Sequence, residues 1–200
     1  MSLYEFTSDW FSHNVPSWQN ALQRAKVMPA RILEVGCYEG RSTVWMMENI
    51  AAPGAELVSI DLWEEGSEAD QQSMDTVEAR FDTNIKIALS KRSDITHKKI
   101  KGRSHACLSR LLADGHQDYF DLTYVDGSHF APAVLTDAVL CFHLTRIGGV
   151  MFFDDYLGAL DRPLNDAPKL AIDSFFACFH GKLGVIPESL YQFYVQKLSD

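Results

Sequence analysis

The sequence predicts an α/β fold built on a doubly wound, mostly parallel sheet. Short apolar runs alternate with segments of helical period along most of the 200 residues. Helices of about ten residues between these runs let neighbouring strands lie parallel, with helices on both faces of the sheet. Near the end, two extended runs over residues 183–187 and 191–198 are joined by three residues only. So short a link cannot hold a parallel crossover. The two runs therefore predict an antiparallel hairpin, and with it a seven-stranded Rossmann-like sheet that has one reversed edge strand.

The first half of the chain supplies three strands and the helices beside them. Pro16 suits the first turn of a helix, and Trp18 and Leu22 recur at helical spacing after it. Short extended runs predict strands over residues 31–35, 57–61 and 100–104. Helical periodicity predicts helices over residues 14–26, 41–50, 71–81, 85–89 and 108–113.

The second half continues the alternation in front of the hairpin. Residues 120–125 and 150–153 are apolar and predict the fourth and fifth strands, with helices over residues 133–144 and 170–180. A chain of this length buries roughly 70% of its unfolded surface, which is enough for one full-sized core. We therefore expect a single domain over residues 1–200, in which the N-terminal helical segment 1–30 covers the active site.

The composition is that of an acidic globular protein. Lys and Arg number 18 against 27 Asp and Glu, so the net charge is −9 with neutral histidines. Binding to nucleic acid or to an anionic membrane relies on clustered Lys and Arg, so this balance argues against both partners. No apolar run approaches the ~20 residues of a membrane span, and the opening segment lacks the basic and apolar regions of a signal peptide. The four cysteines form no CxxC pair. These features predict a cytoplasmic protein with reduced thiols.

The turn after the first strand has the features of a ligand-binding loop. Residues 34–42 read EVGCYEGRS and lead into a helix start, where the backbone can approach a ligand closely. Asp61 ends the second strand about 25 residues after Gly36, a place where a carboxylate accepts hydrogen bonds from ribose hydroxyls. Together they predict an adenosine-bearing ligand. Tyr38 replaces the glycine that admits a pyrophosphate, which disfavours NAD. The alternative is that Gly36 and Gly40 only shape a tight turn and Asp61 caps a helix.

Three carboxylates follow two neighbouring strands. Asp126 ends the fourth strand, and Asp154 and Asp155 end the fifth, so all three are expected to converge at one edge of the sheet. Unpaired, they would raise one another's pKa, and a hard divalent cation such as Mg²⁺ removes that conflict. The alternative is three separate, solvated loop residues.

His129 follows Asp126 by three residues, in the segment DGSH. A loop that leaves the strand at Gly127 can return the imidazole to the acidic cluster. An imidazole has an ordinary pKa of about 6.5, which suits a general base. The alternative for His129 is a local hydrogen bond at a helix start.

Five motifs combine in one order along the chain: EVGxxxGxS at 34–42, Asp61, GRS at 102–104, DGSH at 126–129 and GGVMFFDD at 148–155. In this combination the chain resembles the class I S-adenosylmethionine-dependent O-methyltransferases. The resemblance extends over residues 10–198. It is closest to the metal-dependent group that includes the catechol, caffeoyl-CoA and macrocin-type sugar O-methyltransferases.

The resemblance implies a set of site residues. It implies that S-adenosyl-L-methionine is held by Glu34, Gly36, Tyr38, Gly40, Ser42, Asp61, Leu62, Arg103, Ser104 and Asp126. It implies that Asp126, Asp154 and Asp155 bind a divalent cation, Mg²⁺ by this reasoning. His129 and Asp126 are the implied catalytic residues, with His129 as the base, because the catechol enzymes have a catalytic lysine at the matching place. Asp155 stands where catechol-type enzymes have asparagine, which favours a sugar-type acceptor.

The expected reaction is in-line transfer of a methyl group to a hydroxyl of a small molecule, such as a sugar or natural product. Residues 62–80 and 156–168, together with Trp10, Phe11 and Trp63, are expected to select the acceptor as lids. The alternative for these aromatic residues is an ordinary role as core anchors. Two other functions stay open at this point: a metal-dependent hydrolase that uses the three aspartates, and a cofactor-binding module without catalysis. The sequence is compatible with a homo-oligomer.

Overall fold

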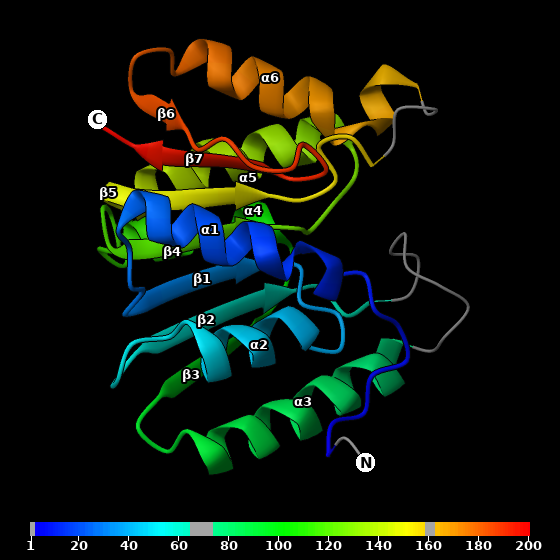
Figure 1. Cartoon of the computed structure of the whole chain (residues 1–200). Coiled ribbons are helices and arrows are strands. Elements are labelled where there is room, and N and C mark those ends of the chain that lie inside the picture. The colour runs from blue at the N-terminus through cyan, green and yellow to red at the C-terminus, as the bar shows by residue number, and fades with distance from the viewer. Residues whose placement is uncertain (1–2, 65–73, 159–162) are drawn as a thin grey trace.

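The computed structural model describes residues 3–64, 74–158 and 163–200, and its strands form one sheet (Figure 1). The strands are β1 (Arg31–Val35), β2 (Glu56–Asp61), β3 (Thr96–Lys101), β4 (Phe120–Val125), β5 (Thr145–Phe153), β6 (Leu183–Val185) and β7 (Phe193–Lys197). The helices are α1 (Val15–Ala25), α2 (Arg41–Asn49), α3 (Met74–Lys91), α4 (Ser104–Ala113), α5 (Ala131–Leu144) and α6 (Pro168–Cys178). The order across the seven-stranded sheet is β3-β2-β1-β4-β5-β7-β6.

The predicted fold class is confirmed. β1 to β5 are parallel, and β7 is antiparallel to both β5 and β6. The position of the reversed strand was predicted wrongly, because β7 lies between β5 and β6 and the edge is formed by β6. The third strand spans Thr96–Lys101, whereas residues 100–104 were predicted, and Ser104 is already the first residue of α4. The helices predicted over residues 71–81 and 85–89 are one helix, α3, and residues 71–73 lie outside the described residues.

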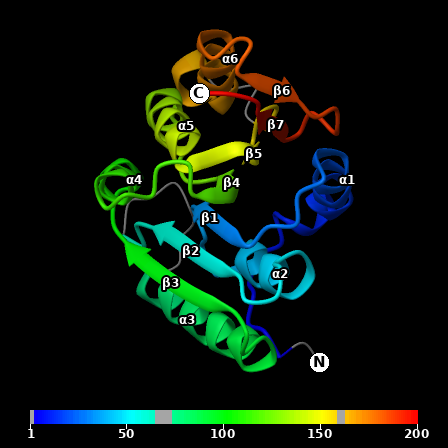
Figure 2. The same ribbon diagram turned by 90° about the vertical axis from the view of Figure 1, so that its left-hand side faces the viewer.

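Helices cover both faces of the sheet, and the side chains of each strand alternate between two apolar cores (Figure 2). Ile32 of β1 belongs to the core that α1, α2 and α3 close. Leu33, the next residue, belongs to the core beneath α4, α5 and α6. This alternation follows from the pleat of a strand, whose successive side chains point to opposite faces of the sheet. In the described ranges, no helix has the length and apolar character that crossing a bilayer requires.

β3 is an edge strand, and α3 supplies the carboxylate that pairs with two of its lysines. Lys99 Nζ lies 2.7 Å from Glu78 Oε1, and Lys101 Nζ lies 2.6 Å from Glu78 Oε2. Ile100, between them, packs into the opposite core, beneath α4. A strand this rich in lysine can therefore pair with β2, because α3 supplies the carboxylate for one face and α4 covers the apolar residue on the other.

The segment ahead of α1 is fastened to the turn that follows β1. Thr7 donates its backbone N–H and its hydroxyl to the Glu39 carboxylate, at 2.6 and 2.8 Å. Arg41 Nε donates to the carbonyl of Ser8 at 2.9 Å. Asn84 of α3 donates to the carbonyl of Glu39 at 2.9 Å, so the segment, the turn and α3 form one hydrogen-bonded unit.

Candidate active site

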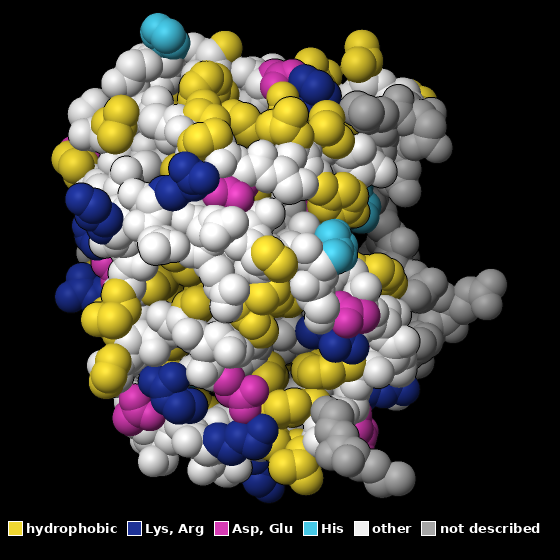
Figure 3. All heavy atoms as spheres, viewed as in Figure 1, with side chains coloured by type: hydrophobic (Ala, Val, Ile, Leu, Met, Phe, Trp, Pro, Cys, Tyr) yellow, Lys and Arg dark blue, Asp and Glu magenta, His cyan; other side chains and the backbone are white. Residues whose placement is uncertain are grey.

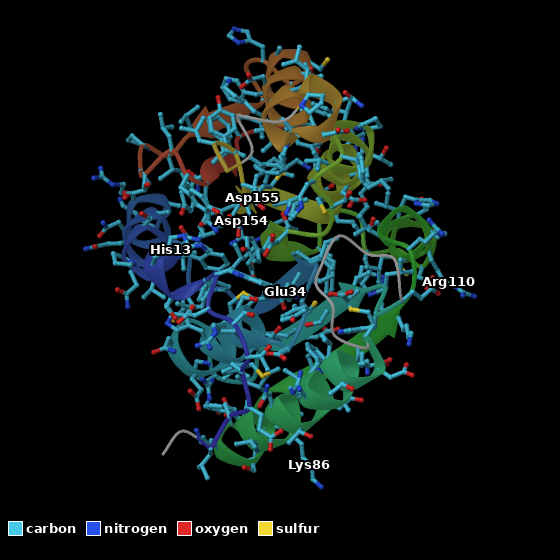
Figure 4. All side chains as sticks on the ribbon, turned by 90° about the vertical axis from the view of Figure 1, so that its right-hand side faces the viewer. His13, Glu34, Lys86, Arg110, Asp154 and Asp155 are labelled. Atoms are coloured by element: carbon cyan, nitrogen blue, oxygen red, sulfur yellow. The ribbon has the colours of Figure 1, made fainter. Side chains whose placement is uncertain are left out.

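A cavity of about 470 Å³ opens at the carboxyl ends of the parallel strands. Figure 4 looks onto this edge of the sheet, with Asp154 and Asp155 near its centre. The loops after β1, β2, β4 and β5 contribute to its wall, as does the segment ahead of α1. Of the predicted site residues, the cavity wall contains Gly36, Tyr38, Ser42, Asp61, Asp126, His129, Asp154 and Asp155. Both predicted clusters therefore face one cavity.

The turn after β1 can exist only with glycine at position 36. Gly36 has φ +85°, and a Cβ atom built on it would lie 1.9 Å from the carbonyl oxygen of Asp126. Tyr38 also has a positive φ, +48°, which is uncommon for a residue with a side chain. The loop consequently passes against the backbone of the β4 end, and this close approach joins the two halves of the cavity.

Asp61 fixes this turn from the end of β2. Its Oδ2 accepts hydrogen bonds from the backbone N–H groups of Cys37 at 2.7 Å and Tyr38 at 2.9 Å. Its Oδ1 accepts one from the N–H of Trp63 at 3.1 Å. Two carboxylate oxygens offer about four acceptor positions, so Asp61 retains capacity for a further donor in the cavity. Its predicted contact with ribose hydroxyls stays a prediction.

The Tyr38 hydroxyl is a buried polar atom with no hydrogen-bond partner among the described residues. Its ring packs on Trp10 with the ring centroids 5.0 Å apart, and both residues border the cavity. An unsatisfied buried hydroxyl costs about 1–3 kcal/mol, so the turn contains a polar atom that the described protein groups leave unpaired.

Glu34 lies behind the turn and outside the cavity wall. It is 1% exposed and accepts hydrogen bonds from the hydroxyls of Ser42, Thr43 and Ser59. Burial raises the pKa of Glu34 to about 7, and the three hydroxyls oppose that rise. Glu34 thus forms a buried polar contact that joins β1, α2 and β2, and the cofactor role that the resemblance implies for it stays a prediction.

We expect Glu34→Gln to change how stability depends on pH. The folded pKa of about 7 exceeds the ordinary value of 4.5, so the folded protein binds the proton more tightly than the unfolded chain does. The stability from this group is complete below pH 4.5 and is lost as the pH rises through 7. The loss amounts to about 3 kcal/mol. Urea unfolding across this range should show the wild type losing stability relative to Glu34→Gln, and parallel pH profiles would contradict the assignment.

Four further residues implied as cofactor contacts lie away from the described wall of this cavity: Gly40, Leu62, Arg103 and Ser104. Gly40 begins α2 with φ +80°, and a Cβ there would lie 2.9 Å from the ring of Phe81. Arg103 instead borders a second cavity between β3 and α4. The described residues therefore leave these four assignments without support.

Asp126 and Asp154 meet at one tyrosine. The Tyr124 hydroxyl lies 2.9 Å from Asp126 Oδ2 and 2.5 Å from Asp154 Oδ2. Burial, together with the charge of the neighbouring aspartates, raises the pKa of Asp126 well above its usual range and also raises the pKa of Asp154. A hydroxyl has one proton to donate, so the second contact needs a proton on one of the carboxyls. Asp126 and Asp154 therefore need one proton between them, and a cation bound by the two carboxylates could take the place of that proton.

Asp155 is turned toward His129. His129 Nε2 lies 2.7 Å from Asp155 Oδ2, and the Tyr191 hydroxyl donates to Asp155 Oδ1 at 2.9 Å. The three aspartates offer carboxylate oxygens, the ligands that Mg²⁺ prefers. In the part of the chain that the structure describes, however, no group of three or more His, Cys, Asp or Glu is arranged to hold a metal ion. Carboxylate oxygens are suitable ligands for a divalent cation, but the Asp155 carboxylate is paired with His129.

Comparison with known proteins identifies the family. A family model described as a methyltransferase domain matches residues 33–156, from β1 to the residues that follow β5. The match covers more than half of the chain. The chain belongs to this methyltransferase family. No curated protein matches the methyltransferase significantly by sequence.

Solved structures share the fold of this methyltransferase. One is the O-methyltransferase TomG from Streptomyces achromogenes, involved in tomaymycin synthesis and solved with SAM; it is 19% identical, with a TM-score of 0.65 over 92% of this chain and 80% of that chain. Another is an O-methyltransferase from Bacillus cereus solved with SAH, 16% identical, with a TM-score of 0.67 over 96% and 84%. A third, MycE from the mycinamycin pathway, was solved with Mg and SAH and is 18% identical, with a TM-score of 0.60 over 96% and 51%. The resemblance drawn from the sequence is confirmed for family and fold.

Two tyrosines that contact the aspartates of the methyltransferase site were not predicted. Tyr124 stands two residues before Asp126, so the alternation of β4 could have placed both on one face. Tyr191 comes from the segment before β7, far from the motifs, and has no local signal. Of the aromatic residues expected as lids, Trp10 and Phe11 border the cavity, but Trp63 is 1% exposed and donates its indole N–H to the Tyr38 carbonyl at 3.0 Å. Trp63 is therefore a core anchor.

Proposed function

We propose that this methyltransferase moves a methyl group from S-adenosylmethionine to a hydroxyl oxygen of a small molecule, such as a sugar or a natural product. One observation carries the proposal: the turn after β1, with Asp61, faces the same cavity as the acidic cluster and His129. Similar folds solved with SAM or SAH support the choice of methyl donor. Two other proteins of similar fold, a TDP-rhamnose 3′-O-methyltransferase of calicheamicin biosynthesis and MycE of the mycinamycin pathway, support the acceptor class.

The cofactor is proposed to lie along the turn. S-adenosylmethionine supplies an activated methyl group when it is bound. Gly36 lets the backbone approach it, Tyr38 borders it, and Asp61 accepts hydrogen bonds from its ribose. The closed contact between the turn and the backbone of Asp126 then keeps this ligand next to the acidic cluster.

We expect Asp61→Ala to weaken binding of S-adenosylhomocysteine by about 1.5–3 kcal/mol, the cost of losing charge-assisted hydrogen bonds. Isothermal titration calorimetry measures the affinity directly. Asp61→Asn is the comparison, because it keeps an oxygen for the N–H groups of Cys37 and Tyr38 while it removes the charge. Unchanged affinity in the alanine variant would contradict the ribose contact.

His129 is proposed to accept the proton of the acceptor hydroxyl. A neutral hydroxyl is a poor nucleophile at pH 7, so its proton has to leave as the new bond forms. Asp155 orients the imidazole through Nε2 and stabilises the imidazolium that results. Trp10, Phe11 and Tyr191 line the same cavity and are proposed to contact the acceptor.

A divalent cation is proposed at Asp126, Asp154 and Asp155. Its support is the crowding of buried carboxylates around Tyr124 and the oxygen-only donor set. A cation there neutralises the carboxylates and lowers the pKa of a bound hydroxyl. It also competes with His129 for Asp155, so activity with and without metal separates the two arrangements.

The decisive experiment is a screen of sugar, phenol and natural-product hydroxyls with methyl-labelled S-adenosylmethionine, run with Mg²⁺ and with EDTA. Label in a product establishes the methyl transfer, and loss of label in EDTA with recovery on added Mg²⁺ establishes the metal. Equal rates in both arms would remove the metal from the proposal. A hydrolase would release no labelled product, and a binding module would bind the cofactor without turnover.

The domain organisation is also a proposal. We propose one domain over residues 1–200 whose first 30 residues cover the active site, supported by the hydrogen bonds that Thr7 donates to Glu39 and that Ser8 accepts from Arg41. Of the expected lids, residues 65–73 and 159–162 lie outside the described residues. Oligomeric state and cytoplasmic location stay predictions.

A further inference from the structure

A second cavity, of about 620 Å³, lies between β3 and α4. Figure 2 shows β3 at the margin of the sheet with α4 beside it and α3 on the other face. None of the described residues that line this cavity lines the candidate active site. Arg110, in its wall, stands at the margin of the molecule, away from Asp154 and Asp155 (Figure 4).

Three cationic side chains border this cavity, and none of them forms an ion pair with another described residue: Lys98, Arg103 and Arg110. The contrast with the next residues of the strand is direct, because Lys99 and Lys101 also border the cavity yet are paired with carboxylates of α3. On the face drawn in Figure 3, dark blue and magenta side chains lie beside one another. In a chain of net charge −9, a cavity with three unpaired cations stands apart from that pattern.

The cavity has an apolar side as well. Ile100, Cys107 and Leu111 line it, and Ile100 and Leu111 belong to the core beneath α4. Asp114 is the one acidic side chain among the described residues of the wall. A ligand that fits both parts has an apolar body and an anionic group.

We propose that this cavity binds a small molecule that carries a phosphate or carboxylate group on an apolar body. Guanidinium groups match the planar or tetrahedral oxygens of such anions, which favours Arg103 and Arg110 as the main contacts. The positive end of α4, which begins at Ser104, acts in the same direction. A volume of about 620 Å³ is in the range of small-molecule pockets.

A simpler role exists for the lysines alone. Lysine on an edge strand discourages pairing with other chains, and this explains Lys98 without any ligand. It does not explain Arg103 and Arg110, because they lie at and beyond the start of α4 and protect no strand edge. The arginines are therefore the residues that distinguish the two explanations.

The test is a fluorescence titration of the full chain with 1-naphthyl phosphate, which has both parts of the proposed ligand. We expect saturable binding that Arg110→Ala weakens about 10- to 100-fold, as expected for the loss of a charge-assisted hydrogen bond. Lys86→Ala is the matched control, because it removes one exposed positive charge from α3, outside the described wall of the cavity, and is expected to change the affinity less than about twofold. Arg110 is exposed, so its variant should keep the wild-type melting temperature, and Lys98→Ala repeats the test on the strand.

Several outcomes would overturn the proposal. These are the absence of saturable binding, equal losses in Arg110→Ala and Lys86→Ala, or displacement of the probe by S-adenosylhomocysteine. Inorganic phosphate has only the anionic group of the probe, and 1-naphthol has only its apolar body. Each should bind more weakly than 1-naphthyl phosphate, and equal binding of either one would also refute a site that uses both parts. None of these results depends on whether the methyl transfer proposed above occurs.

Discussion

Replacing His129 with alanine is expected to lower the turnover number about 10²- to 10⁴-fold, the usual contribution of a general base. The imidazole borders the cavity and is paired with Asp155, so its removal deletes the proposed proton acceptor without changing the turn that is proposed to bind the cofactor. Base catalysis acts in the transition state, so the affinity for S-adenosylhomocysteine should stay within a factor of about two. Single-turnover methyl transfer and calorimetry measure the two quantities separately.

His180→Ala is the control for this variant, because His180 is exposed and lies outside the described wall of the cavity. It should retain full turnover. Near-normal turnover in His129→Ala would reduce His129 to a structural partner of Asp155. Activation of the hydroxyl would then belong to the proposed cation alone.

Gly36→Ala is expected to destabilise the protein by about 2–5 kcal/mol. A positive φ costs an alanine about 1–2 kcal/mol, and forcing a methyl group into occupied space costs about 1–3 kcal/mol more. The second cost arises because the new Cβ would lie 1.9 Å from the Asp126 carbonyl oxygen, so β1 and β4 cannot keep their present contact. Urea unfolding measures the loss, and S-adenosylhomocysteine should bind more weakly as well.

Gly54→Ala separates the two costs. Gly54 has φ +76°, close to that of Gly36, but a Cβ there would meet nothing within 4 Å. It should therefore show only the backbone cost of about 1–2 kcal/mol. Equal destabilisation in the two variants would mean that the close approach of the turn to Asp126 contributes nothing.

Most of the fold could be predicted from the sequence because apolar periodicity and turn residues are local signals. β1 was predicted with its observed bounds, since RILEV is an apolar run stopped by Gly36. β3 was misplaced, because its lysines gave no apolar signal and its partners on α3 are distant in the sequence. The place of β7 inside the sheet also depends on pairing between strands, which no local pattern encodes.

The candidate site was predictable where it depends on strand ends. Asp61, Asp126 and Asp154 follow strands and face one cavity, as the general rule for parallel sheets requires. The hydrogen bonds that Glu34 accepts from three hydroxyls could not be predicted, because Ser42, Thr43 and Ser59 belong to α2 and β2 and only the tertiary fold brings them to β1. Tyr191 could not be predicted, since only the tertiary fold brings it to Asp155.

The central place of β7 has a consequence for synthesis on the ribosome. β5 obtains its second neighbour only when residues 193–197 have emerged, although every other strand has by then been translated. During that interval the growing chain presents β5 as an open edge, and β6 has no partner in the sheet. Open edges on nascent chains pair readily with other chains, so this is the period in which a chaperone would matter most. Pairing of β7 with β5 closes this open edge and buries Lys197. The Lys197 ammonium group then lies 2.6 Å from Asp118 and 3.0 Å from the carbonyl of Thr145.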